Sequence, residues 1–169
     1  MQETLRASEE KYRSLFESSR DAHTTIEPPS CKFTSANSSM LRMFKANNEA
    51  EFLLNTPWSL SPKRQPDGRL SSEKAKEMIE AALRDDETNL FEWTHKRIDG
   101  ETFPAEILLT KVEIKEKIFL LVAIRDITQR KKAEEEMEKR LRELEVFYQA
   151  SVGREERIIE RFKYTHLTA

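Results

Sequence analysis

Residues 91–114, FEWTHKRIDGETFPAEILLTKVEI, carry the strongest structural signal in the chain. Two runs in which apolar and polar residues alternate flank Asp99-Gly100, and an Asp-Gly pair in that position predicts a β-hairpin. A second reversal near Glu116 leads into residues 117–127, KIFLLVAIRDI, whose apolar run predicts a further strand. The second half of the chain therefore predicts three consecutive antiparallel strands.

The first half of the chain supplies the remaining elements of the same domain. Residues 21–27, DAHTTIE, and 31–37, CKFTSAN, predict two strands separated by a turn at Pro28-Pro29. A helix is predicted after Ser71 or Ser72, either of which can cap it, because apolar residues recur there at helical spacing: Ala75, Met78, Ile79, Ala82 and Leu83. The order of elements predicts an α+β fold, with a five-stranded antiparallel sheet and helices on one face.

Amphipathic segments flank the predicted domain on both sides. Residues 129–165 contain no proline and only one glycine, which predicts a long C-terminal helix. Its apolar positions step by four, four, three and four residues, close to a coiled-coil seam with one stutter: Ala133, Met137, Leu141, Leu144 and Tyr148. We therefore expect an N-terminal amphipathic helix over 1–20, a core domain over 21–128, and a coiled-coil helix with a short tail over 129–169.

The C-terminal helix favours a homodimer, because a polar helix of this length is marginal in water without a partner. The apolar seam would then pack against the same seam of a second copy. A single solvated helix, or a helix that packs back on its own domain, is the alternative.

Composition excludes several classes of protein. The 169-residue chain has 29 basic and 31 acidic residues interspersed along it, so no basic surface for nucleic acid is expected. Cys31 is the only cysteine, which is typical of a reducing compartment. No apolar run approaches the roughly 18 residues needed to span a bilayer. We expect a cytoplasmic protein without membrane insertion.

The predicted order of elements resembles that of a PAS domain. Residues 91–114 are similar to the strand, hairpin and strand of that family's C-terminal half, the PAC motif. Residues 120–136, LLVAIRDITQRKKAEEE, resemble its last strand and terminal D-I-T, and residues 56–83 resemble PAS modules that precede histidine kinase cores. The resemblance covers about residues 8–134. It implies a sensor in signal transduction, of the kind found in two-component systems.

The resemblance gives Asp126, Ile127 and Thr128 the role of a signal relay between the last strand and an output helix. Asp and Thr side chains can hydrogen-bond backbone groups at such a junction, while Ile anchors it in the core. As an N-cap alone, the triad is worth about 1 kcal/mol. A cap and a coupling point are compatible, and we expect both.

A small-molecule ligand of a PAS domain would lie between the inner face of the sheet and the helices within residues 37–83. The large apolar residues of this part of the domain are the pocket candidates: Phe44, Phe52, Trp58, Met78 and Trp93. They can also simply fill the core, which is the favoured interpretation for Phe44 and Met78. Trp58 is the stronger functional candidate, because it lies in a proline-rich loop where a large aromatic often closes a cleft.

Some PAS domains bind flavin or haem. The flavin-cysteinyl type needs a cysteine in an N-C-R-F-L-Q helix, whereas Cys31 follows two prolines in a turn. Haem types commonly take an axial histidine from the long helix, which has none here, and His23 and His95 are predicted on strands, where a lone histidine is more often structural. We expect no cofactor and no metal. Non-covalent flavin stays open, because its pocket needs only an apolar slot and a few polar groups.

No catalytic residues are expected, because the chain lacks a phosphoacceptor histidine beside acidic residues and the glycines of a nucleotide-binding loop. The leading hypothesis is a PAS sensory and dimerisation module that passes a conformational signal into the C-terminal helix. The rivals are a structural oligomerisation domain without a ligand, and a flavin- or haem-dependent redox sensor. Residues 152–160 resemble a linker to a histidine kinase or another output domain, so the chain is either a piece of a larger protein or a stand-alone module.

Overall fold

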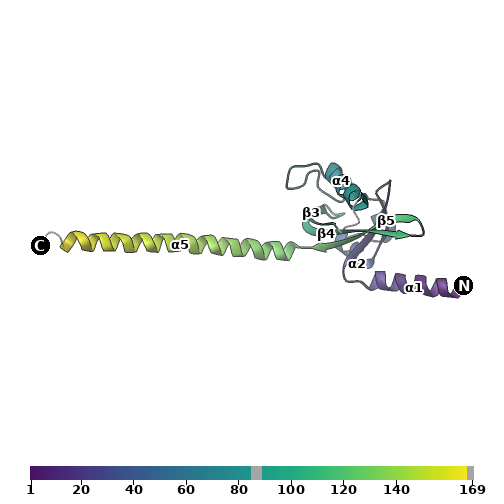
Figure 1. Ribbon diagram of the computed structural model, residues 1–169, viewed down its shortest axis with the longest axis horizontal. Helices are drawn as coiled ribbons and strands as arrows, with labels where there is room; N and C mark the ends of the chain where they lie inside the picture. The colour runs from purple at the N-terminus through teal and green to yellow at the C-terminus, as the bar shows by residue number, and fades with distance from the viewer. Residues whose placement is uncertain (85–88, 167–169) are drawn as a thin grey trace. The chain divides into compact units, whose positions relative to one another are not determined.

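A computed structural model of the protein describes residues 1–84 and 89–166. The chain divides into two compact units, Met1–Thr128 and Gln129–Ala169. The first unit contains all five strands, and the second consists of most of the long C-terminal helix (Figure 1). In chain order the elements are α1 (Gln2–Ser18), β1 (Ala22–Glu27), β2 (Lys32–Ala36), α2 (Ser38–Phe44), α3 (Glu49–Leu53), α4 (Ser71–Arg84), β3 (Asn89–Lys96), β4 (Thr102–Ile114), β5 (Lys117–Asp126) and α5 (Thr128–His166).

The five strands form one antiparallel sheet in the order β2-β1-β5-β4-β3. This arrangement confirms the sheet that the sequence predicts. Gly100 lies in the β3–β4 hairpin with a positive φ of 93°, a conformation that favours glycine. The β4–β5 hairpin turns at Lys115 and Glu116, which take positive φ angles of 48° and 64° without a glycine. The β3–β4 and β4–β5 turns therefore both lie where the alternation of apolar and polar residues in the sequence ends.

The β1–β2 turn is also built without glycine. The Pro28-Pro29 peptide bond is cis, and Cys31 takes a positive φ of 53°. The backbone N–H of Cys31 donates to the carbonyl of Glu27 at 3.1 Å, which closes the turn. The two strands pair antiparallel with a bulge between Thr25 and Ile26.

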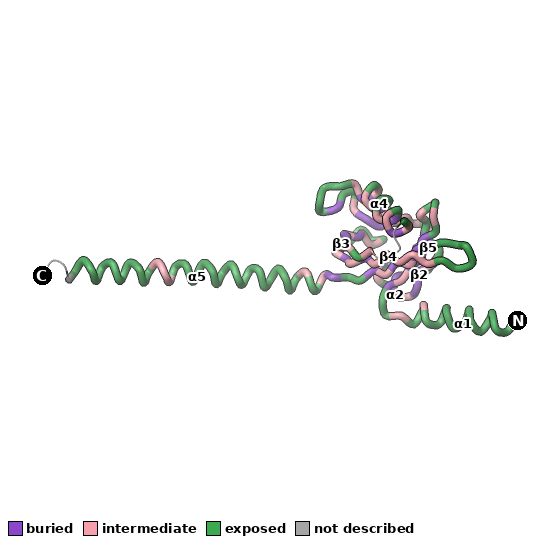
Figure 2. The backbone as a smooth tube through the Cα atoms, viewed as in Figure 1, coloured by how far each residue is buried: buried purple, intermediate pink, exposed green. Residues whose placement is uncertain are grey.

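The core lies between the sheet and the helices α2, α3 and α4, which pack on one face. Strands β3, β4 and β5 bury alternate residues along most of their length, as a sheet with one covered face requires. On α4 the buried apolar positions Ala75, Ile79 and Ala82 are spaced by four and three residues, so they form one face of the helix. Figure 2 shows that burial is concentrated in this region, whereas α1 contains no buried residue.

A buried amide joins three elements at one end of the sheet. The side chain of Asn37 is fully buried, and its oxygen accepts hydrogen bonds from the backbone N–H groups of His23 and Met40, each at 3.0 Å. Its nitrogen donates to the carbonyls of Phe16 and Asp21 at 3.0 and 2.9 Å. Asn37 thus caps α2 and also fixes the end of α1 against β1.

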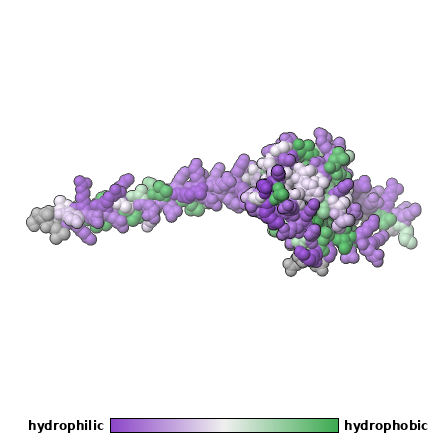
Figure 3. Space-filling model, turned by 90° about the horizontal axis from the view of Figure 1, so that it is seen from above, coloured by the Kyte–Doolittle hydropathy of each residue, from purple (hydrophilic) through white to green (hydrophobic). Residues whose placement is uncertain are grey.

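Helix α5 is continuous over 39 residues and includes Gly153. Four apolar residues of the predicted seam, Met137, Leu141, Leu144 and Tyr148, are each more than half exposed. The surface of this helix is mainly hydrophilic, with apolar side chains at intervals (Figure 3).

Candidate functional site

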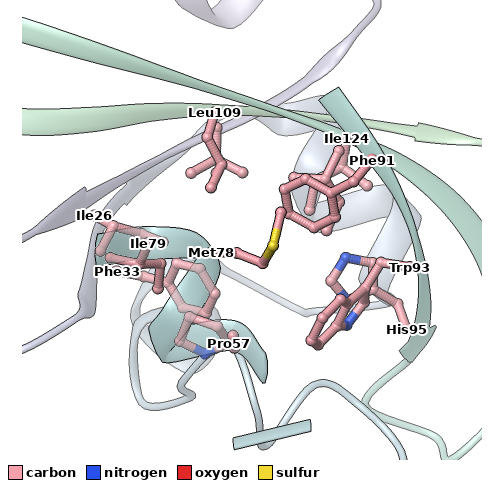
Figure 4. A pocket seen from close by; sticks show the side chains of 13 residues that line it. Ile26, Phe33, Pro57, Met78, Ile79, Phe91, Trp93, His95, Leu109 and Ile124 are labelled. Atoms are coloured by element: carbon pink, nitrogen blue, oxygen red, sulfur yellow. The ribbon is translucent and has the colours of Figure 1, made fainter. Parts of the chain in front are cut away.

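An apolar cavity of about 40 Å³ lies between the inner face of the sheet and α4 (Figure 4). Strand β3 contributes Phe91, Trp93 and His95, which lie on one face because side chains alternate along a strand. Helix α4 contributes Met78 and Ile79 among others, and the remaining strands contribute mainly branched aliphatic side chains. No lining residue carries a formal charge at neutral pH. The cavity is therefore suited to apolar or neutral groups.

His95 is the only ionisable residue of the cavity lining among the described residues. Its side chain is 5% exposed, and its Nδ1 lies 3.1 Å from the carbonyl oxygen of Leu60. Burial lowers the pKa of His95 from 6.5 to about 4, although the hydrogen bond to Leu60 opposes this effect. The imidazole is therefore neutral at physiological pH.

The loop between α3 and α4 is fixed to β3 by buried polar contacts. The indole N–H of Trp93 donates to the hydroxyl of Ser61 at 2.9 Å. The amide of Gln65 accepts from the backbone N–H of Thr94 at 2.8 Å and donates to the hydroxyl of Ser71 at 2.9 Å. These satisfied contacts hold the loop against the edge of the cavity.

The structure separates the five predicted pocket residues into two groups. Met78 and Trp93 line the cavity. Phe44 and Phe52 are fully buried in the core, with ring centroids 5.7 Å apart, and are not part of the lining. Trp58 is half-buried against the core and also lies outside the lining, although its neighbour Pro57 is part of it.

The junction between β5 and α5 is held by Asp126. One carboxylate oxygen of Asp126 accepts from the backbone N–H of Thr128 at 2.9 Å and also from its hydroxyl. Ile127 is 3% exposed, and its backbone N–H donates to the carbonyl of Pro104 at 3.1 Å. The first residue of α5 is therefore bonded to the last residue of the sheet, and the residue between them is buried.

The second carboxylate oxygen of Asp126 accepts from Arg97 at 2.9 Å. Burial would raise the pKa of Asp126, but the hydrogen bonds from Thr128 and Arg97 outweigh it and lower the pKa below its usual value. The guanidinium of Arg97 also lies 3.9 Å from the ring centroid of Phe103 and donates to the carbonyl of Met43. Arg97 thus connects the β3–β4 hairpin and the end of α2 to the junction.

A family model described as PAS domain matches residues 21–129. This chain belongs to the PAS domain family. No curated protein matches the sequence at a significant level.

Solved structures of PAS domains and related receptors share the fold. The PAS domain of an HTR-like protein from Haloarcula marismortui is 21% identical, with a TM-score of 0.61 over 75% of this chain and 97% of that one. A PAS domain from a two-component sensor histidine kinase is 16% identical, with a TM-score of 0.58 over 72% and 97% of the two chains. An RNA-binding light-oxygen-voltage receptor is 19% identical, with a TM-score of 0.62 over 77% of this chain and 36% of that one. At these identities the likeness concerns the fold alone.

The cavity of this PAS domain does not fit a flavin. Its volume of about 40 Å³ is well below the roughly 150 Å³ of a cavity that binds a single benzene ring, and a flavin has three fused rings. The pyrimidine edge of a flavin also carries both donors and acceptors, whereas the unpaired buried side-chain atom of the described lining is His95 Nε2. Haem is larger still, so the same volume does not fit it.

In residues 1–84 and 89–166, no group of three or more His, Cys, Asp or Glu side chains is placed to hold a metal ion. None of the described helices is both long and apolar enough to cross a membrane.

Sequence reasoning did not single out the roles of His95 and Arg97. The two-residue alternation of β3 places His95 on the same face as Trp93, and this signal could have added it to the cavity lining. Arg97 has no comparable signal, because its partner Asp126 is 29 residues away along the chain.

Proposed function

We propose that this PAS domain is a cytoplasmic sensory and dimerisation module that passes a conformational bias from its cavity into α5. The observation that carries the proposal is the side chain of Asp126, which bonds the start of α5 through Thr128 and the β3–β4 hairpin through Arg97. The family membership and the likeness to a PAS domain of a sensor histidine kinase support a role in signal transduction. The proposed role is not catalytic.

The proposed route runs from the cavity along β3 to the junction. His95 lines the cavity, and Arg97 follows two residues later, directly beyond the end of β3. The side chain of Arg97 is 13% exposed, so its ion pair with Asp126 is screened by solvent less than a surface pair. A small displacement of β3 would therefore change the contact that fixes Asp126, and through it the first turn of α5.

The proposed output is a dimer formed through α5. Ala133, Met137, Leu141, Leu144 and Tyr148 would form the seam with a second copy, because exposed apolar residues at this spacing are what a coiled coil buries. We propose the corresponding division into an N-terminal helix over 1–20, a PAS core over 21–128 and a signalling helix over 129–169. A histidine kinase or another output domain would respond to the geometry of this dimer.

Hydrogen exchange at the second turn of α5 tests the proposal. Asp126→Ala removes both the bond to Thr128 and the bond to Arg97, whereas Arg97→Gln removes the ion pairs of Arg97 with Asp126 and Glu101 and leaves the bond to Thr128 in place. If the junction couples sheet and helix, both variants speed exchange of the second-turn amides, which are the first to be hydrogen-bonded within α5, relative to wild type. Faster exchange in Asp126→Ala alone would leave the triad as a helix cap and would favour a structural oligomerisation domain.

A further inference from the structure

Two turns of α5 carry no charge on any face. Residues 146–153, VFYQASVG, are all uncharged, whereas the helix on both sides of them is rich in Arg, Lys and Glu. Apart from Gln149 and Ser151, every residue of this segment is apolar or glycine. Val146 and Phe147 are 70% and 71% exposed. A helix that is apolar around most of its circumference is expected to be covered on more than one side.

The proposed coiled-coil seam covers only one side of this segment. In the heptad that places Leu144 at position d and Tyr148 at position a, Val146 takes position f and Phe147 position g. Position f lies on the side of the helix opposite the seam, because each residue turns the helix by about 100°. A second face is therefore left exposed, and we define this off-seam face as Val146, Phe147, Ala150 and Gly153.

Gly153 on the off-seam face has no evident use in the isolated helix. A glycine inside a helix is less favourable than an alanine. Beyond the helix's own backbone and the two adjoining residues, a Cβ atom at Gly153 would meet nothing within 4 Å in the described part of the chain. The absence of a side chain is useful where a neighbouring molecule approaches the backbone closely. Gly153 and Ala150 thus form a shallow strip that a large side chain from another helix can enter.

The charges that flank the off-seam face favour a second copy in antiparallel orientation. Glu143 and Arg157 are exposed and lie seven residues before and after Ala150, at the same heptad position. The Nε of Arg157 donates to the carbonyl of Gly153 at 3.0 Å, which holds the guanidinium beside this face. With a twofold axis at Ala150, each Glu143 would face an Arg157, and each Phe147 would face a Gly153. Parallel helices would instead bring like charges together.

We propose that the off-seam face binds the same face of α5 in a second copy of this chain, in antiparallel orientation and centred on Ala150. This contact goes beyond the proposed sensory function, because it joins two α5 dimers side by side through residues that the seam does not use. The contact covers only about four turns of helix. It is therefore weaker than the seam and forms at higher protein concentration.

Sedimentation equilibrium of the full chain over a series of concentrations measures this second association. Dimers of the wild type should associate further as the concentration rises, and Phe147→Gln should weaken this step about tenfold. Gly153→Ala should also weaken it, although alanine favours the helix, because the added methyl group prevents close approach. Gln149→Ala, at a position outside both faces, is the control. Dimers that do not associate further in the wild type, or that associate equally in Phe147→Gln and Gly153→Ala, would overturn the proposal.

Reversal of the flanking charges tests the antiparallel orientation. Glu143→Arg and Arg157→Glu should each weaken the association of dimers about threefold, because each variant brings like charges together twice in the contact. The double variant should recover the wild-type association, since opposite charges then face each other again. A double variant that associates more weakly than either single variant would contradict the antiparallel contact.

Failure of the off-seam contact and failure of the seam give different results. Leu144→Glu removes the seam and leaves the off-seam face intact. If only the off-seam contact is right, the wild type and Leu144→Glu form the same dimers, which Phe147→Gln separates into single chains. If only the seam is right, the wild type and Phe147→Gln remain dimers at every concentration, and Leu144→Glu gives single chains.

Discussion

The buried imidazole of His95 makes the stability of the domain depend on pH. Its pKa is about 4 in the folded protein against 6.5 for an ordinary histidine, so the unfolded chain takes up this proton at a higher pH. The free energy of unfolding should therefore fall as the pH decreases through this window. The loss attributable to His95 reaches about 3 kcal/mol near pH 4.

Urea denaturation of the wild type and of His95→Phe at pH 7 and at pH 4.5 measures this contribution. Between pH 7 and pH 4.5, the free energy of unfolding should fall by about 2 kcal/mol more in the wild type than in the variant. The variant is the reference because other groups, including Asp126, titrate equally in both proteins. Equal losses would mean that burial does not lower the pKa of His95 in the folded protein.

The alternation of side-chain direction along β3 predicts that Trp93 faces a packed layer. The structure agrees, because Trp93 is only 5% exposed. The partners that give these residues their chemistry could not be predicted. His95 is bonded to Leu60, which is 35 residues away along the chain, and Trp93 to Ser61, which is 32 away. Both partners belong to an irregular loop whose path depends on tertiary packing and carries no periodic signal.

The β4–β5 hairpin carries two residues in a conformation that favours glycine. Lys115 and Glu116 both have positive φ, which is the geometry that Asn-Gly adopts in a two-residue hairpin. Replacing the pair by Asn-Gly should raise the free energy of unfolding by about 1 kcal/mol, measured by urea denaturation. Glu113→Gly on the adjacent strand is the control and should lower it by roughly 0.5–1 kcal/mol. A loss of stability in the Asn-Gly variant would contradict the turn geometry.

The elements were predictable to the extent that their signal is local. Asp99-Gly100 marks one hairpin directly, and the regular spacing of Ala75, Met78 and Ile79 marks α4. At Glu116 the end of the alternation indicates a reversal, but the turn type could not be predicted because neither central residue is glycine or asparagine. The contact between Arg97 and Asp126 joins two elements distant in sequence and required the structure.

At the scale of the whole molecule, α5 is expected to hold the dimer. Removing residues 129–169 should leave a folded PAS domain, because the contacts at Ile127 and Asp126 belong to the first compact unit. Light scattering should show a dimer for the full chain and a monomer for the shortened chain at the same concentration. A shortened chain that remains a dimer would place the interface on the domain itself, including α1.

The central claim is that the ion pair between Arg97 and Asp126 couples the sheet to the geometry of α5. The most direct measurement is the distribution of distances between spin labels at Leu144 in the two chains of the proposed dimer, recorded well below the unfolding transition. Lys45→Gln is the control, because Lys45 pairs with Asp99 and Glu101 in the same hairpin but makes no ion pair with Asp126 among those that the described residues show. The coupling predicts a changed distribution in Arg97→Gln and an unchanged one in Lys45→Gln. Identical distributions in Arg97→Gln and the wild type would contradict it.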